Sequence, residues 1–466
     1  MLIELTSDFE NKEQELGTQP NLENKCQIKD EKQIEGRPTH SKISSDTTVL
    51  RATLMLTNIC LGTSIFAFST YTKSFGLVWM IFFCIIVALI SYWSLRNCII
   101  ASSKFDVDDY SEITEKILGR KARIILNIFI IAFSYGVLIA IFILIFSLTG
   151  RFIHAVKSND NITYDNFAEE KWQKAYVKYP FMLGIALILS FINLIKDITK
   201  LHFSSYISVS SVIYCLFVIV IECNKYYQHY KTEIFDEYNE SSHINYIDLR
   251  KAFTNKLIFF KGFSNLVLAF NSHVGVFPVF AGLKYQKEGI KKMKLSIFFS
   301  LLILIALYLI SMICSYLTDP LSPEELVIYR KPISNGNDIP MSIAKLLMAI
   351  NLIFIIPGLF CGLRLSFANA FTKGNITSLF NIIYTFSSML ISALIAASYD
   401  KILSYLSYLG GFISVFICYL FPTLLIIYTS EKPFAYWKNL LNLILTIILC
   451  IIGIIGGIRT IIDDVS

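Results

Sequence analysis

The chain has 466 residues, of which 55% are hydrophobic and only 16% are charged, and its formal net charge is +6. This apolar fraction is high for a soluble globular protein, and the charged fraction is low. The basic residues lie in short segments between apolar runs, so a nucleic-acid partner is not expected. Repeated uncharged runs of about 20 residues are long enough to cross a bilayer as helices. The sequence therefore predicts an all-α integral membrane protein surrounded by lipid.

The chain divides into a polar and an apolar segment. Residues 1–46 are rich in Glu, Lys, Asn and Gln and contain no apolar run, which predicts a disordered cytoplasmic tail. Residues 47–466 are predicted to form the transmembrane domain. Its eleven expected spans are residues 48–71, 75–99, 124–153, 179–195, 202–223, 257–283, 295–317, 341–363, 377–398, 402–428 and 439–459.

The distribution of Lys and Arg predicts the orientation. Five basic residues between spans 2 and 3, and five more between spans 6 and 7, lie on one predicted side. Short basic loops are typically cytoplasmic, which places the N-terminus inside. Asn161 and Asn239 begin Asn-X-Ser/Thr sequons in loops on the other side, so both are expected to be glycosylated. The expected location is the plasma membrane or a lysosome- or vacuole-type membrane.

The cysteines are scattered along the chain, and two lysines lie within predicted spans. The ten cysteines show no metal-site spacing, so neither a metal nor a cofactor is expected. Cys223 and Cys314 are predicted near the outer ends of spans 5 and 7, which leaves open a disulfide between them. Lys261 and Lys345 also lie close to predicted outer span ends, where their ammonium groups are expected to reach water.

Two spans, each the first of a group of five, are interrupted near the middle by a glycine among small polar residues. The residues at these breaks are Asn58, Gly62, Thr63, Ser64, Asn271, Ser272 and Gly275. Interrupted helices at equivalent positions of two halves indicate a substrate site at the bilayer midplane. Free amides at a half-helix N-terminus attract a carboxylate, and free carbonyls hold an ammonium group or a cation. The alternative is that the glycines only allow close helix packing.

Other side chains near the breaks are candidates for covering the substrate or for coupling. Tyr135 in span 3 and Phe270 beside the second break could cover a bound substrate, or could pack against other spans. Asn58 and His273 are the candidates for binding a coupling ion, because an amide oxygen binds cations and an imidazole titrates near neutral pH. Both could instead hydrogen-bond to neighbouring helices.

Four motifs occur in a characteristic order, namely residues 58–65 with 74–76, 109–121, 272–278 and 357–364. Together they resemble the amino acid/auxin permease family, most closely its sodium-coupled neutral amino acid transporters, over residues 48–367. The resemblance implies amino acid substrates and a LeuT-type fold. That fold has two inverted repeats of five spans, here about 48–223 and about 257–428, followed by one extra helix at about 439–459.

The eighth span departs from the sodium-coupled pattern. In those members, hydroxyls of this span help to hold the ion beside the first break. Here residues 341–363 contain Ser342 at the outer end and no other Ser or Thr, and Ile353 and Ile355 stand where hydroxyls are expected. The sequence therefore predicts proton-coupled or facilitative transport.

The chain is interpreted as a secondary transporter that moves neutral amino acids by alternating access, since no charged residue lies near either break. An enzyme is disfavoured because P-loop, HExxH and GxSxG motifs are absent, as is any pair of carboxylates within the spans. Two alternatives remain open. One is an amino-acid-sensing protein (a transceptor) of the same fold, and the other is a major-facilitator-type transporter.

Overall fold

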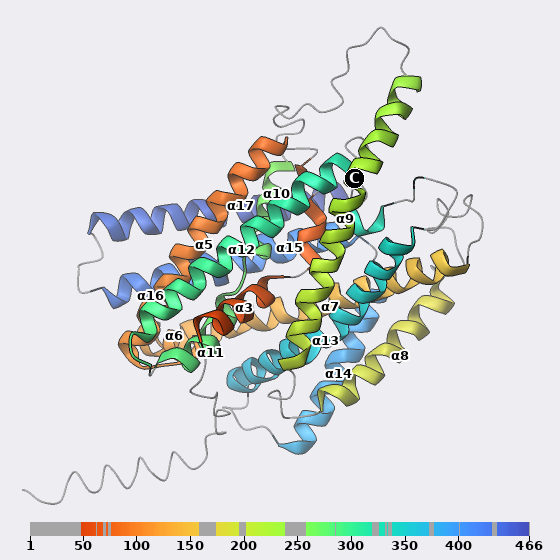
Figure 1. Cartoon of the computed structure of the whole chain (residues 1–466). Helices are drawn as coiled ribbons and strands as arrows, with labels where there is room; N and C mark the ends of the chain where they lie inside the picture. The colour runs from red at the N-terminus through yellow and green to blue at the C-terminus, as the bar shows by residue number, and fades with distance from the viewer. Residues whose placement is uncertain are drawn as a thin grey trace, which may run out of the picture. The chain divides into compact units, whose positions relative to one another are not determined.

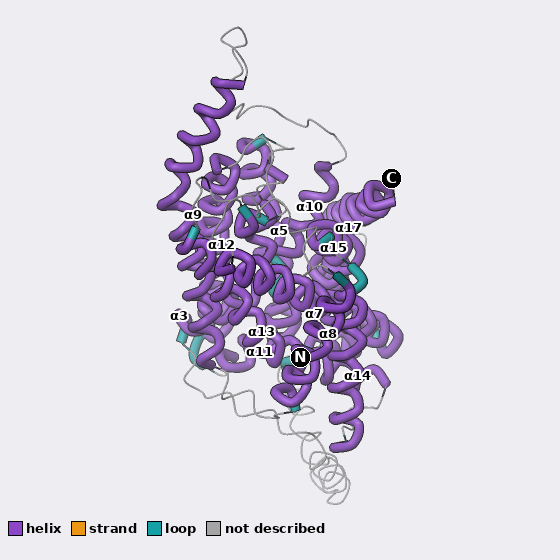
Figure 2. Tube along the Cα trace, turned by 90° about the vertical axis from the view of Figure 1, so that its right-hand side faces the viewer, coloured by secondary structure: helices purple, strands orange, loops and turns teal. Residues whose placement is uncertain are grey.

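The computed structural model describes part of the chain and divides it into the units Met1–Ser45 and Asp46–Ser466. The described residues are 48–61, 63–68, 71–72, 76–157, 174–194, 202–237, 258–284, 286–318, 326–330, 333, 338–371, 377–399, 401–430 and 436–465. All of them belong to the second unit, so the predicted tail at 1–46 lies outside the described residues. Within these ranges every regular element is a helix (Figure 2).

Ten helical segments among the described residues are long and apolar enough to cross a membrane. They are α5 (Leu77–Phe105), α7 (Arg120–Lys157), α8 (Ala175–Asn193), α9 (His202–Glu237), α10 with α11 (Ile258–Ala269 and His273–Lys284), α12 (Gly289–Thr318), α13 (Ile339–Phe371), α14 (Ser378–Ala397), α15 to α16 (Ile402–Tyr408 to Phe421–Thr429) and α17 (Trp437–Val465). The predicted all-α membrane protein is confirmed.

The predicted first span consists of two short pieces. α3 (Val49–Cys60) is too short to cross a bilayer alone, and the 3-10 turn η1 (Thr63–Ala67) follows it. The count of eleven spans therefore stays a prediction. Between α15 and α16 the chain adopts two π-helical segments, η6 (Leu409–Ser414) and η7 (Phe416–Leu420), and a short η5 turn (Val327–Tyr329) precedes α13.

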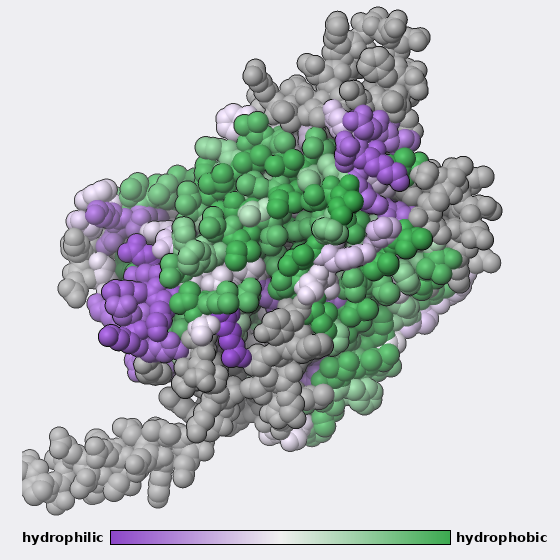
Figure 3. All heavy atoms as spheres, in the orientation of Figure 1, coloured by the Kyte–Doolittle hydropathy of each residue, from purple (hydrophilic) through white to green (hydrophobic). Residues whose placement is uncertain are grey.

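The interrupted spans pack against several other helices of the second unit. α12 packs against α3, α5 and α9, while α13 packs against α7 and α9 (Figure 1). α10 contacts α17 and η6. Figure 3 shows apolar side chains over the middle of the visible face and hydrophilic ones gathered toward its ends, as expected for a bilayer-spanning protein.

α10 runs against two glycine-lined surfaces. A Cβ atom added to Gly410 of η6 would overlap the backbone of Ser264, and one added to Gly456 of α17 would overlap the Phe260 carbonyl. The Ser264 hydroxyl lies 3.4 Å from the carbonyl oxygen of Gly453. Small residues of this kind let membrane helices approach backbone to backbone. The extra helix α17 therefore packs directly against the first half of the second broken span.

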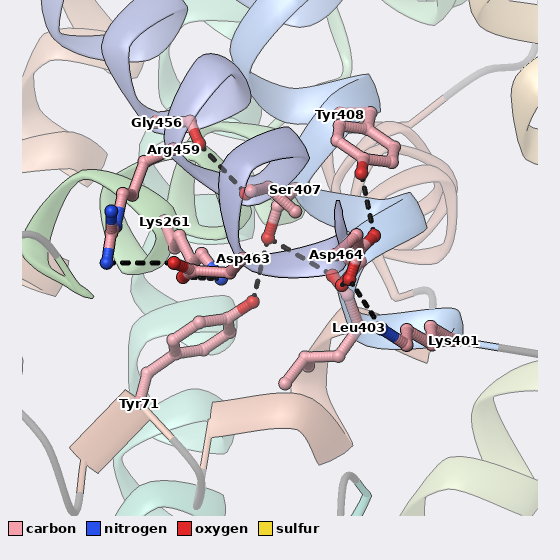
Figure 4. A network of polar contacts seen from close by, with 12 residues as sticks. Tyr71, Lys261, Lys401, Leu403, Ser407, Tyr408, Gly456, Arg459, Asp463 and Asp464 are labelled. Atoms are coloured by element: carbon pink, nitrogen blue, oxygen red, sulfur yellow. Dashed lines mark hydrogen bonds and ion pairs between the residues drawn. The ribbon is translucent and has the colours of Figure 1, made fainter. Parts of the chain in front are cut away.

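The C-terminal end of α17 carries two carboxylates that bind other helices (Figure 4). Asp463 lies 2.5 Å from Lys261 of α10 and 2.9 Å from Arg459 of its own helix. Asp464 accepts hydrogen bonds from Tyr399, Lys401, Ser404 and Tyr408. We call these residues the Asp463 network. It joins α17 to α10 and to the chain around α15.

A second set of contacts lies at the Lys284 end of α11. The Lys284 ammonium is 2.7 Å from both Asp106 and Asp108, in the segment between α5 and α6 (Tyr110–Leu118). The bond from Lys284 holds the pKa of the Asp106 carboxyl below its usual value. α6 then ends at Gly119, whose φ of 88° is a conformation that favours glycine.

The prediction that Lys261 and Lys345 reach water is wrong for Lys345, which is only 2% exposed. Lys345 experiences the charges of Arg151, Arg330 and Asp338. Arg330 in turn forms ion pairs with Glu222 and with Asp338. The cause is tertiary packing, because neighbouring elements enclose a side chain that an isolated helix would direct to solvent.

Candidate substrate site

The first predicted break is present immediately after Cys60. Leu61 leaves the helical conformation with φ −71° and ψ 72°, and the chain resumes as η1. Asn58 is half-buried in the last turn of α3. Gly62 lies outside the described residues, as do the side chains of Thr63 and Ser64. Their binding roles therefore stay predictions.

The second predicted break separates α10 from α11. Phe270 forms a turn after Ala269, and Asn271 and Ser272 are not helical. The Asn271 Oδ1 atom accepts the backbone N–H of His273 at 3.4 Å, and its Nδ2 atom donates to the Ser414 hydroxyl at 3.4 Å. An Asn side chain in this position satisfies a free amide at the start of a helix. Asn271 thus hydrogen-bonds the start of α11 and connects the break to η6.

The two breaks lie against each other. A Cβ atom added to Gly275 would lie 2.6 Å from Cδ1 of Ile59, so this glycine allows α11 to approach α3. The Cys60 thiol and the Ser272 hydroxyl are hydrogen-bonded. The structure therefore brings the end of α3 together with Phe270, Asn271, Ser272 and Gly275. Gly275 lies at this contact, and both its binding role and the packing alternative stay predictions.

The helix ends at the breaks create opposite local potentials. α3 and α10 both end there, and a helix C-terminus carries unpaired carbonyls and a partial negative charge. α11 begins there, and its N-terminus carries free amides and a partial positive charge. No charged side chain occurs within residues 58–68 or 269–276. This arrangement of backbone groups can bind the ammonium and carboxylate of a zwitterion without a buried ionic partner.

Comparison with known proteins identifies the family of this chain. Residues 45–462 match the model of the family described as transmembrane amino acid transporter protein. The chain belongs to this family. It is 22% identical over 431 residues to sodium-coupled neutral amino acid transporter 7 of Xenopus laevis, covering 86% of this chain and 87% of that protein. The family predicted from the motifs is confirmed, which favours a transporter over a membrane enzyme or a major-facilitator-type protein.

A solved transporter structure matches most of this chain. It is the crystal structure of the Eremococcus coleocola manganese transporter in complex with an aromatic bis-isothiourea substituted compound. The match covers 91% of this chain and 98% of that chain, with 12% sequence identity and a TM-score of 0.45. Agreement at this level does not support any conclusion about the site.

His273 is buried at the start of α11. Its Nε2 atom lies 3.1 Å from the Ser94 hydroxyl, and Ser94 donates to the carbonyl of Cys418. A serine hydroxyl has one hydrogen, so with Ser94 donating to Cys418 the Nε2 atom of His273 is the donor to Ser94. Nδ1 is buried and has no hydrogen-bond partner among the described residues. The interpretation as a neutral histidine bonded to a neighbouring helix fits this arrangement, and its coupling role stays a prediction.

The two aromatic candidates have different surroundings. Phe270 is fully buried at the second break and packs edge-on against Tyr308 at 5.2 Å. The hydroxyl of Tyr135 lies 2.7 Å from the Ser388 hydroxyl and 3.3 Å from that of Tyr384, both on α14. Among the described contacts Tyr135 therefore bonds to α14, and its role in covering a substrate stays a prediction.

Sequence reasoning missed Tyr308, which lies on α12 and touches both breaks. Its hydroxyl donates to the carbonyl oxygens of Cys60 at 3.1 Å and of Ala269 at 2.7 Å. These are the last residues of α3 and α10. The available signal was the one hydroxyl within residues 301–310 of span 7, which are otherwise apolar. Its partners could not be predicted from the sequence.

The remaining site predictions concern the loops and the cysteine pair. Asn161 and Asn239 lie outside the described residues, so their glycosylation stays a prediction. Cys223 and Cys314 are neighbours, since the Cys223 thiol lies 3.6 Å from the Cys314 carbonyl oxygen. Both are free thiols in this structure.

Proposed function

We propose that this protein is a secondary transporter that moves neutral amino acids by alternating access. The observation that carries the proposal is the meeting of the α3 and α10 C-termini with the α11 N-terminus at two adjacent breaks. The substrate ammonium would face the carbonyl ends, and its carboxylate would face the amides around residues 62–64 and the start of α11. The Lys284 end would face the cytoplasm, together with the N-terminus.

The preference for neutral side chains follows from the charges at the breaks. A fixed charge on the substrate side chain would need a buried partner, and the residues named above provide none. The relative from Xenopus laevis is itself named as a carrier of neutral amino acids. We expect purified protein in liposomes to take up labelled neutral amino acids saturably. Saturable uptake of arginine or glutamate without competition from neutral amino acids would contradict this specificity.

Gly62→Val should abolish this uptake while leaving membrane insertion intact, because valine removes both space and backbone freedom at the first break. Gly184→Val is the matched control, since no atom lies within 4 Å of a Cβ added to Gly184 in α8. Uptake and the gel-filtration profile of both variants should be measured together. Wild-type kinetics in Gly62→Val would mean that the glycine only serves packing.

The driving force is proposed to be protons or the substrate gradient alone. The relative's name includes sodium coupling, whereas the 341–363 segment of this chain offers one hydroxyl, Ser342, and the amide of Asn351. His273 is the one imidazole at the breaks. Uptake should therefore persist when choline replaces sodium at constant pH. Loss of uptake in choline would overturn the proposal.

A pH jump at constant sodium separates the two remaining mechanisms. Stimulation by external acid that disappears in His273→Ala would indicate proton coupling through this residue, whereas no response to pH would indicate facilitated diffusion. A transceptor would bind the same amino acids without flux. Equilibrium binding measured beside uptake in the same preparation distinguishes a transceptor from a transporter.

A further inference from the structure

Tyr308 lies between the two halves of the site and contacts each half in the same way. It is fully buried on α12, and its hydroxyl bonds to the terminal carbonyls of α3 and α10. Its ring packs edge-on against Phe68, which follows the first break, at 5.3 Å, and against Phe270 of the second break at 5.2 Å. The side chain is thus centred on the point where the two broken spans meet.

The electrostatics of this point favour a positive charge. Two helices end at the carbonyls of Cys60 and Ala269, and the dipole of each directs its negative end at the same place. Carbonyl groups freed by helix breaks at membrane depth are the groups that coordinate monovalent cations in transporters of interrupted helices. Here a hydroxyl hydrogen occupies that position instead.

The number of donors and acceptors is unequal. A tyrosine hydroxyl has one hydrogen, whereas two carbonyl oxygens lie within hydrogen-bonding distance of it. The hydrogen is shared or alternates between them, so the pair of carbonyls is only partly satisfied. A cation at the same point would interact with both oxygens at once.

We propose that the Tyr308 hydroxyl replaces a monovalent cation between the C-termini of α3 and α10. In its absence the two carbonyls would accept sodium. The inference rests on the proposed function in placing the substrate site at these breaks, and it supplies a structural reason why sodium is not needed there. α12 anchors the arrangement further, because the Ser311 hydroxyl donates to the Ile65 carbonyl of η1 at 2.7 Å.

The test is the cation dependence of thermal unfolding for purified wild type and Tyr308→Phe. The phenylalanine keeps the ring contacts and removes only the hydroxyl. In Tyr308→Phe we expect sodium chloride to raise the Tm by about 2 °C more than choline chloride when sodium is in tenfold excess over its Kd. Wild type should show no sodium-specific shift. Ser311→Ala is the matched control, since it removes a neighbouring hydroxyl bond and should behave as wild type toward sodium.

The sodium response decides the proposal. A Tyr308→Phe protein that does not respond to sodium would overturn it, as would a wild type that responds to sodium as strongly as the variant. If Tyr308→Phe does not fold, wild type decides alone, because a sodium-specific Tm rise in wild type contradicts an occupied cation position and its absence supports one.

Failure of this inference differs from failure of the proposed function. The unfolding assay needs no transport, so a sodium response created by Tyr308→Phe would stand even if no amino acid is taken up. Conversely, sodium-independent uptake by wild type with an unresponsive Tyr308→Phe would leave the transporter function intact and reject only the role of Tyr308.

Discussion

Asp109 is the N-cap of α6 and is half-buried, two properties that oppose each other for a carboxylate. Its Oδ1 atom accepts the backbone N–H of Glu112 at 2.9 Å, which satisfies a free amide of the first turn. Burial raises the pKa of the Asp109 carboxyl in the folded state. Because the pKa of this carboxyl is higher in the folded than in the unfolded state, its contribution to stability is complete below the unfolded pKa of about 4. That contribution is lost as the pH rises through the folded pKa.

Asp109→Asn should therefore separate the two effects. Asparagine keeps the cap and removes the buried charge, so we expect its Tm to equal or exceed that of wild type at pH 7 and to lose this advantage toward pH 4. Asp109→Ala should be less stable than Asp109→Asn by about 1 kcal/mol at both pH values, because only the alanine variant loses the cap. Thermal unfolding of the three proteins at the two pH values measures this. A destabilised Asp109→Asn at pH 7 would show that the charge itself is needed.

Residue identity predicted the positions of the breaks because their cause is local. Glycine and small polar residues weaken a helix wherever the chain passes, and Asn271 caps the helix that follows it. The side chains that contact the breaks could not be predicted. Tyr308 and Cys60, for example, are far apart in the sequence and meet only through tertiary packing. The burial of Lys345 was mispredicted for the same reason, since its charged neighbours come from other elements.

At the scale of elements, span positions followed from hydrocarbon thickness, which demands about 20 apolar residues whatever the packing. Helix ends did not. α9 continues past the predicted Cys223 to Glu237, where polar residues no longer belong to a bilayer segment but still form helix. The π-helical segments η6 and η7 were not predicted either. η6 lies where Gly410 approaches α10, a contact that depends on the arrangement of three helices.

The glycine-lined contact between α10 and α17 gives a test at this scale. Gly456→Ala should destabilise the protein by about 1–3 kcal/mol, because its Cβ would overlap the Phe260 carbonyl and the backbone would have to move. Gly184→Ala, in a helix where the added atom meets nothing within 4 Å, should be neutral or slightly stabilising. Thermal unfolding of the two variants side by side measures the difference. Equal stability would mean that α17 does not pack tightly against α10.

At the scale of the whole second unit, the extra helix α17 links elements that are distant in the sequence. Its glycines contact α10 and η6, and the Asp463 network binds the first turn of α10 and the chain around α15 (Figure 4). The Tyr71 hydroxyl, which follows η1, reaches Ser407 of α15 at 2.9 Å. Tyr71 thereby connects the first broken span to α15 directly. The second broken span is connected to α15 through α17, by Lys261 of α10 and the Asp463 network. Nothing in the apolar pattern of α17 predicts this role.

The ion pair between Lys261 and Asp463 tests whether that connection contributes to stability. The two side chains are 16% and 30% exposed, so water screens the pair only in part. Lys261→Gln should cost about 0.5–1 kcal/mol, whereas Arg459→Gln should cost less, because Arg459 contacts the same carboxylate from within α17 and joins no second helix. A double-mutant cycle of Lys261→Gln with Asp463→Asn, measured by thermal unfolding, isolates the interhelical term. This coupling should shrink as ionic strength rises, since salt screens partly exposed charges. A coupling energy of zero at low salt would mean that the glycine contacts alone hold α17 against α10.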